Sequence, residues 1–195
     1  MAAKKNTKST WTAIRQHLKS LESDALIALI KDLHDSSPTN RNFLRARVSA
    51  AEGGADSLES YRKRVTEPFY PLRGEAKLKL GEARKAIREY RKAIREYRKA
   101  TSNIPGTIEL LLTYVEAGTR FTNENGDIDE RFYDSLSSAL GEMAALLKKE
   151  KPSAWLAVEQ RLAKLDAETH FIGWGYGDHV SWIYEGLLKH FSKPI

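Results

Sequence analysis

The chain contains no cysteine among its 195 residues. It can therefore form no disulfide, no thiolate zinc site and no cysteine nucleophile, which fits a reducing compartment. No apolar run approaches the length of about 18 residues that a membrane-spanning helix needs. The basic stretch 1–10 has no apolar segment behind it, so we expect a disordered tail there and no secretory signal. These absences predict a cytoplasmic protein that makes no contact with a membrane.

Recognisable catalytic and metal-binding patterns are missing as well. The histidines at 17, 34 and 190 stand alone on predicted helices, and no serine lies in a nucleophile-elbow sequence. The loop 123–130 is rich in oxygen ligands, but Ile128 stands where a calcium-binding EF-hand loop needs glycine. We therefore expect no catalytic residue, no metal and no cofactor, and the interpretation as an enzyme is the weaker one.

Alternation of polar and apolar residues with a period of two is absent too, whereas helical periodicity runs through almost the whole chain. This pattern predicts an all-α fold with about eight to nine helices in a single domain over residues 11–195. Glu52-Gly53-Gly54 marks a sub-boundary near 52–56. We expect one helix to end near Gly118, before a polar loop at 122–127, and Asp127 or Asp129 to cap the next helix.

A seven-residue unit, RKAIREY, occurs twice without change and begins a third time in residues 84–100. Seven residues make almost two helical turns, so a repeated unit keeps the faces of a helix nearly in register. We expect one long basic helix of about 26 residues, from about Glu75 to Thr101. Its apolar residues follow a heptad spacing. These residues are Ala76, Leu80, Ala83, Ile87, Tyr90, Ile94 and Tyr97.

The repeated stretch carries eight basic and two acidic residues, a net charge of +6 that equals the net charge of the whole chain. Glu89 and Glu96 fall near lysines of the same helix, which leaves a row of arginines without acids. We call this row the arginine stripe. Its members are Arg84, Arg88, Arg91, Arg95 and Arg98.

Two interpretations of the arginine stripe remain open. Arginine offers planar, bidentate donors for phosphate or carboxylate, so the stripe is a candidate surface for nucleic acid or for an acidic protein. Alternatively the stripe pairs with the acidic segment 124–168 of the same fold, or simply faces water. A third hypothesis concerns Ile94 and Tyr97: if the second copy of the unit protrudes, these residues offer a seam for a homo-oligomer. In that case deleting residues 94–100 should leave the melting temperature nearly unchanged.

The segment 170–179 places three glycines between aromatic residues and ends in an acid and a histidine. One hypothesis is a small-molecule or hydrolytic site in a pocket here, with Asp127 and Asp129 near it in space. Its candidate residues are His170, Trp174, Asp178 and His179. The simpler interpretation is structural: Gly173 ends a helix, Trp174 and Tyr176 fill the core, and Asp178 caps the last helix.

Four segments together resemble an uncharacterised family of small bacterial all-helical proteins, a domain of unknown function. They are residues 21–44, 67–90, 114–136 and 172–184. The resemblance implies an all-helical fold and no established activity, cofactor or partner. The sequence as a whole favours a non-enzymatic binding or scaffold module that meets an anionic partner through the arginine stripe.

Overall fold

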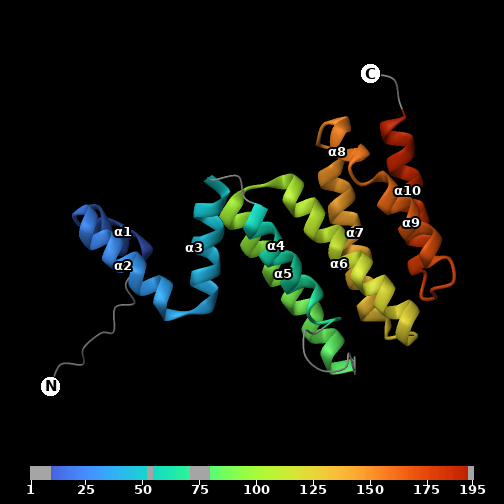
Figure 1. Ribbon diagram of the computed structural model, residues 1–195, viewed down its shortest axis with the longest axis horizontal. Coiled ribbons are helices and arrows are strands. Elements are labelled where there is room, and N and C mark those ends of the chain that lie inside the picture. The colour runs from blue at the N-terminus through green and yellow to red at the C-terminus, as the bar shows by residue number, and fades with distance from the viewer. Residues whose placement is uncertain (1–9, 52–54, 71–79, 193–195) are drawn as a thin grey trace. The chain divides into compact units, whose positions relative to one another are not determined.

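The computed structural model describes residues 10–51, 55–70 and 80–192, without the side chains of residue 55 and of residues 80–84. The described residues form ten α-helices and no strand, so the all-α prediction is confirmed (Figure 1). The chain divides into two units, Met1–Arg45 and Ala46–Ile195. The predicted tail at 1–10 lies almost wholly outside the described residues, and the expectation of a single domain stays a prediction.

The first unit contains α1 (Trp11–Lys19), α2 (Ser23–Ser36) and the beginning of α3 (Pro38–Ala51). Thr10 caps α1, because its hydroxyl accepts a hydrogen bond from the backbone N–H of Ala13. Pro38 begins α3. Proline suits this position because backbone N–H groups in the first turn of a helix have no partner in the helix, and proline has no N–H. None of the residues of α1 and α2 is buried.

The second unit is built around α6 (Ile104–Asn125). This helix packs against α4 (Ala55–Thr66), α5 (Leu80–Thr101), α7 (Glu130–Leu147) and α9 (Glu159–Thr169). The last helix, α10 (Tyr176–Phe191), lies on α7 and α9, and the short α8 (Pro152–Leu156) precedes α9. Because neighbours surround it, α6 buries most of its side chains between Gly106 and Thr122.

Helix α6 extends beyond its predicted end near Gly118. Asn103 begins it, since its side-chain oxygen accepts from the N–H of Gly106, and Pro105 occupies the first turn. Gly118 does not end the helix. It lies inside α6, where a side chain would collide with Leu136 of α7. The predicted loop at 122–127 is therefore helical as far as Asn125.

The spacing of Trp155, Val158, Leu162 and Leu165 predicts one helix, but residues 152–169 form two, α8 and α9. The backbone of Val158 leaves the helical region, with φ −122° and ψ −14°, and this separates α8 from α9. The predicted long helix is present as α5, described over 22 residues; its expected beginning at 75–79 lies outside the described residues. Helix α6 has the same length, so α5 is not singular in this respect.

Candidate anion-binding surface

The two copies of RKAIREY present equivalent faces of α5. Ala86, Ala93 and Ala100 follow one another at heptad intervals, and all three are fully buried. Tyr90 and Tyr97 are buried beside them, whereas Ile87 lies half-buried at the edge of this face. Both copies therefore bury their alanine and their tyrosine, as positions seven residues apart on one helix should.

Ile94 and Tyr97 are not available to a second chain. Only 5% of Ile94 and none of Tyr97 is exposed, and the ring of Tyr97 meets that of Tyr61 on α4 edge-on, with 5.4 Å between centroids. The hypothesis that these residues protrude and form a seam for a homo-oligomer is therefore wrong. The second copy belongs to the core of the unit, because α4 and α6 reach far enough along α5 to cover it.

Acids and arginines lie on different sides of α5. Glu96 points to α4, where its carboxylate accepts a hydrogen bond from Arg64 at 2.8 Å. The sequence analysis, which placed Glu96 near lysines of its own helix, did not foresee this partner on α4. At 100° per residue, Glu89 and Glu96 lie about 130° around the helix from the centre of the arginine stripe. This separation leaves the stripe without an acidic neighbour on α5.

Four members of the stripe have exposed side chains, namely Arg88, Arg91, Arg95 and Arg98. The side chain of Arg84 is not among those that the structure describes. Among the described residues, no carboxylate pairs with Arg88, Arg91 or Arg95. Arg98 alone has such a partner, Glu142 on α7, at 2.5 Å, with about two-fifths of each side chain exposed. Pairing of the stripe with the acidic segment 124–168 is therefore limited to this one contact in the described part of the chain.

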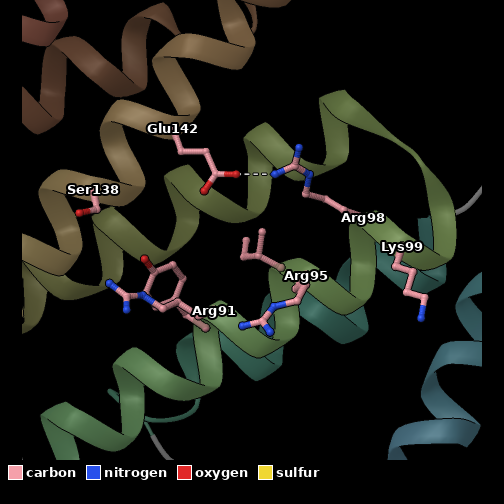
Figure 2. A pocket seen from close by; sticks show the side chains of 8 residues that line it. Arg91, Arg95, Arg98, Lys99, Ser138 and Glu142 are labelled. Carbon is pink, nitrogen blue, oxygen red and sulfur yellow. Dashed lines mark hydrogen bonds and ion pairs between the residues drawn. The ribbon is translucent and has the colours of Figure 1, made fainter.

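A groove of about 680 Å³ runs between α5 and α7 along the stripe (Figure 2). Arg91, Arg95 and Arg98 surround its opening, and Glu142 reaches Arg98 from the opposite wall. Its apolar floor and its cationic rim suit an anionic group with some apolar surface. The lining residues are Tyr90, Arg91, Ile94, Arg95, Arg98, Lys99, Ser138 and Glu142.

The floor of the groove is held rigidly. The ring of Tyr90 stacks on that of Tyr114 in α6, with 3.7 Å between centroids and 12° between planes. The hydroxyl of Tyr114 is hydrogen-bonded to that of Ser135 on α7 at 2.9 Å, and burial strongly raises the pKa of Tyr114. The neighbouring Tyr90 raises the pKa of Arg91, so this guanidinium stays cationic at all ordinary pH values.

Three of the four candidate residues in the segment 170–179 are exposed, and the hypothesis of a site there stays a prediction. His170 and Asp178 are exposed, and Trp174 is 61% exposed, so its expected place in the core is wrong. The Nε2 atom of His179 is buried, but it has no hydrogen-bond partner in the described part of the chain. The titratable partner that general acid–base chemistry would require is thus not found.

The structural interpretation of this segment is only half correct. Tyr176 is buried as expected, and its hydroxyl is hydrogen-bonded to that of Thr119 on α6 at 2.7 Å. The cap of α10 is Gly175, whose φ of +69° favours glycine, and Asp178 lies in the first turn without a capping hydrogen bond. Gly177 packs against the backbone of Thr169. A Cβ atom on Gly177 would lie 2.5 Å from the carbonyl oxygen of Thr169, so there is no room for a side chain.

Asp127 and Asp129 have local structural partners. The carboxylate of Asp129 caps α7 by accepting from the N–H of Phe132 at 2.9 Å, as predicted. Asp127 accepts from the hydroxyl of Tyr133 at 2.9 Å. In residues 10–51, 55–70 and 80–192, no group of three or more His, Asp or Glu side chains is arranged to hold a metal ion.

A second charged cluster was missed by the sequence analysis. Arg161 of α9 binds Glu116 of α6 through two bonds of 2.8 and 2.7 Å, and it also reaches Glu109 at 2.5 Å. Arg62 of α4 donates to the same Glu109 at 2.8 Å. Burial raises the pKa of Glu109, but Arg161 and Arg62 together lower it by more. The pKa of Glu109 therefore lies below its ordinary value. Two glutamates seven residues apart in the otherwise uncharged stretch 104–119 were the signal for this cluster.

The described helices include none that is both long enough and apolar enough to cross a membrane. Comparison of the chain with protein-family models, curated proteins and solved structures finds no match. The resemblance to an uncharacterised helical family therefore stays a prediction.

Proposed function

We propose that this chain is a non-enzymatic binding module that holds an anionic partner on the arginine stripe of α5. The single observation that carries the proposal is the exposure of Arg88, Arg91 and Arg95, which have no carboxylate partner among the described residues. Arg91 and Arg95 also line the groove between α5 and α7. Neighbouring guanidiniums repel one another, and an anion that binds across them removes this repulsion. Arg98 adds a fourth donor group once Glu142 releases it.

The contrast with the second charged cluster supports this proposal. A second groove, of about 400 Å³, lies between α4, α6 and α9. Its Arg62 and Arg161 are engaged by Glu109 and Glu116, so its charge is largely neutralised from within. Along the stripe the balance is different, because a single carboxylate faces four described arginines. An external anion therefore gains most at the stripe.

A charge-reversal experiment on a heparin column tests the proposal. The variant Arg88→Glu/Arg95→Glu should elute at a much lower salt concentration than the unmodified chain. The matched control is Lys164→Glu/Lys189→Glu, which makes the same change in net charge at exposed positions on α9 and α10. Since retention by net charge alone would shift both variants equally, equal elution of the two variants would refute the proposal.

A further inference from the structure

We infer that the partner is an acidic segment of another protein, and that Glu142 occupies its place on Arg98 in the free chain. This inference rests on the proposed function, because it names the class of anion that the stripe takes up.

The two walls of the groove differ in charge. The α5 wall is cationic, whereas the α7 wall presents the hydroxyl of Ser138 and the carboxylate of Glu142. Asp134, one turn before Ser138, is exposed and extends the acidic character of α7. A nucleic acid carries a negative charge at every phosphate and would be repelled along this wall. A protein segment can direct its carboxylates to α5 and a hydroxyl, an amide or a cation to α7.

The aromatic residues of α5 are unavailable to bases. Tyr90 and Tyr97 are buried, and Tyr90 is already stacked on Tyr114. Proteins that bind single strands usually stack the bases on exposed aromatic rings, which the described part of α5 does not offer. Guanidinium forks pair with carboxylates through two parallel hydrogen bonds, so a carboxylate ligand makes full use of the stripe.

The pair Arg98–Glu142 shows, within the free protein, how a carboxylate binds to an arginine of the stripe. Glu142 reaches across the groove from α7, and this carboxylate is the one that engages the stripe among the described residues (Figure 2). About two-fifths of each side chain is exposed, so the pair is readily exchanged for a carboxylate from outside. An arriving acidic segment thus binds Arg91 and Arg95 first and then displaces Glu142 from Arg98.

Fluorescence anisotropy with two probes tests the inference. The probes are a labelled peptide of consecutive glutamates and a labelled DNA duplex of matched charge, both titrated at the same salt concentration. We expect the peptide to bind more tightly than the duplex. We also expect Glu142→Gln to tighten peptide binding about two- to fivefold, because the internal competitor is gone.

The control for this gain is Glu168→Gln, which removes an equal charge from an exposed ion pair with Lys164 on α9 and should leave the affinity unchanged. Adding Arg98→Gln to Glu142→Gln should abolish the gain. Tighter binding of the duplex, or equal effects of Glu142→Gln and Glu168→Gln, would overturn the inference. After either of these outcomes, the proposed function still stands if the double variant Arg88→Glu/Arg95→Glu binds the probe more weakly than the unmodified chain. If that double variant binds both probes like the unmodified chain, the proposed function itself fails.

Discussion

At the scale of single residues, the buried tyrosines fall into two groups. The hydroxyls of Tyr61 and Tyr97 are buried without a hydrogen-bond partner among the described residues, whereas those of Tyr114 and Tyr176 are paired. A buried unpaired hydroxyl destabilises a fold, and a paired one is costly to remove because its partner is left alone. Tyrosines of identical burial should therefore respond to substitution in opposite ways.

We expect Tyr97→Phe to leave the free energy of unfolding unchanged or to raise it by up to about 1 kcal/mol. Tyr114→Phe should lower it by about 1 to 3 kcal/mol, since the hydroxyl of Ser135 loses its partner in the core. Urea denaturation of the two variants, monitored by circular dichroism, measures both values. A larger loss for Tyr97→Phe than for Tyr114→Phe would contradict this account of the core.

Glu109 provides a prediction about pH. Its pKa in the folded chain is lowered, so its ion pairs stabilise the fold above the usual pKa of glutamate, about 4.3. This stabilisation is lost as the pH falls through the lower, folded pKa. Glu109→Gln should cost about 1 to 3 kcal/mol at pH 7, because Arg161 and Arg62 lose a shared partner. The difference from the unmodified chain should shrink toward pH 3.

Urea denaturation at a series of pH values checks this expectation, because urea does not screen charges. The control is Glu185→Gln, which breaks only an exposed pair with Lys189 at 3.9 Å and should have little effect at any pH. A cost of Glu109→Gln that is independent of pH would show that its carboxylate charge contributes nothing.

At the scale of the helix, the repeated unit determines what a deletion does. If residues 94–100 are removed, Ile87 and Tyr90 take the core places of Ile94 and Tyr97. The heptad register then brings Ala83 to the place of Tyr90, so the stack on Tyr114 is lost. Loss of a buried aromatic ring costs about 3 to 5 kcal/mol, which lowers the melting temperature by at least about 6 °C.

This expectation reverses the one drawn from the sequence, in which the second copy was dispensable. The control is the same deletion combined with Ala83→Tyr, which returns an aromatic ring to the vacated place and should recover most of the loss. Thermal unfolding of the three chains compares them directly. An unchanged melting temperature after the simple deletion would mean that the second copy does not contribute to the core.

Sequence periodicity predicted the elements well where polar caps mark their ends. Asp129, one of the two residues that the sequence offered as a cap, does cap α7, and Thr10 caps α1 in the same way, because capping depends on residues close in the chain. The extent of α6 was missed, since Gly118 resembles a helix end until Leu136 of a distant helix packs against it. Whether the second RKAIREY unit protrudes also depended on partners far along the chain.

The candidate site was predicted only in part, for the same reason. The sequence alone places the arginines of α5 on one side of a helix, because that depends on spacing. It does not reveal that Glu96 turns to Arg64 or that Glu142 reaches Arg98, since both pairs join residues more than thirty positions apart. The cluster around Arg161 likewise needs three helices to meet.

At the scale of the whole molecule, the buried apolar side chains of the described residues are concentrated in the second unit, from Ala46 to Leu187. A chain of residues 37–195 keeps this core, and it also keeps Ser37, whose hydroxyl accepts from the N–H of Asn40 at the start of α3. We expect this chain to melt cooperatively within about 3 °C of the full chain.

The matched truncation removes residues 176–195 and with them Tyr176, Val180 and Leu187, which are buried in α10. This loss should abolish cooperative unfolding, because α7 and α9 would be left with an uncovered apolar face. Circular dichroism during heating distinguishes the two truncated chains. Non-cooperative melting of residues 37–195 would show that the second unit depends on the first.

The most direct test of the central claim, anion binding by the arginine stripe, is a nuclear magnetic resonance titration of the isotope-labelled chain with the glutamate peptide. We predict that the shifted signals, including the side-chain Nε–H of Arg91, Arg95 and Arg98, lie on residues 88–99 of α5 and 138–142 of α7. Shifts centred on the segment 170–179, or on the cluster around Arg161, with α5 unaffected, would contradict the account.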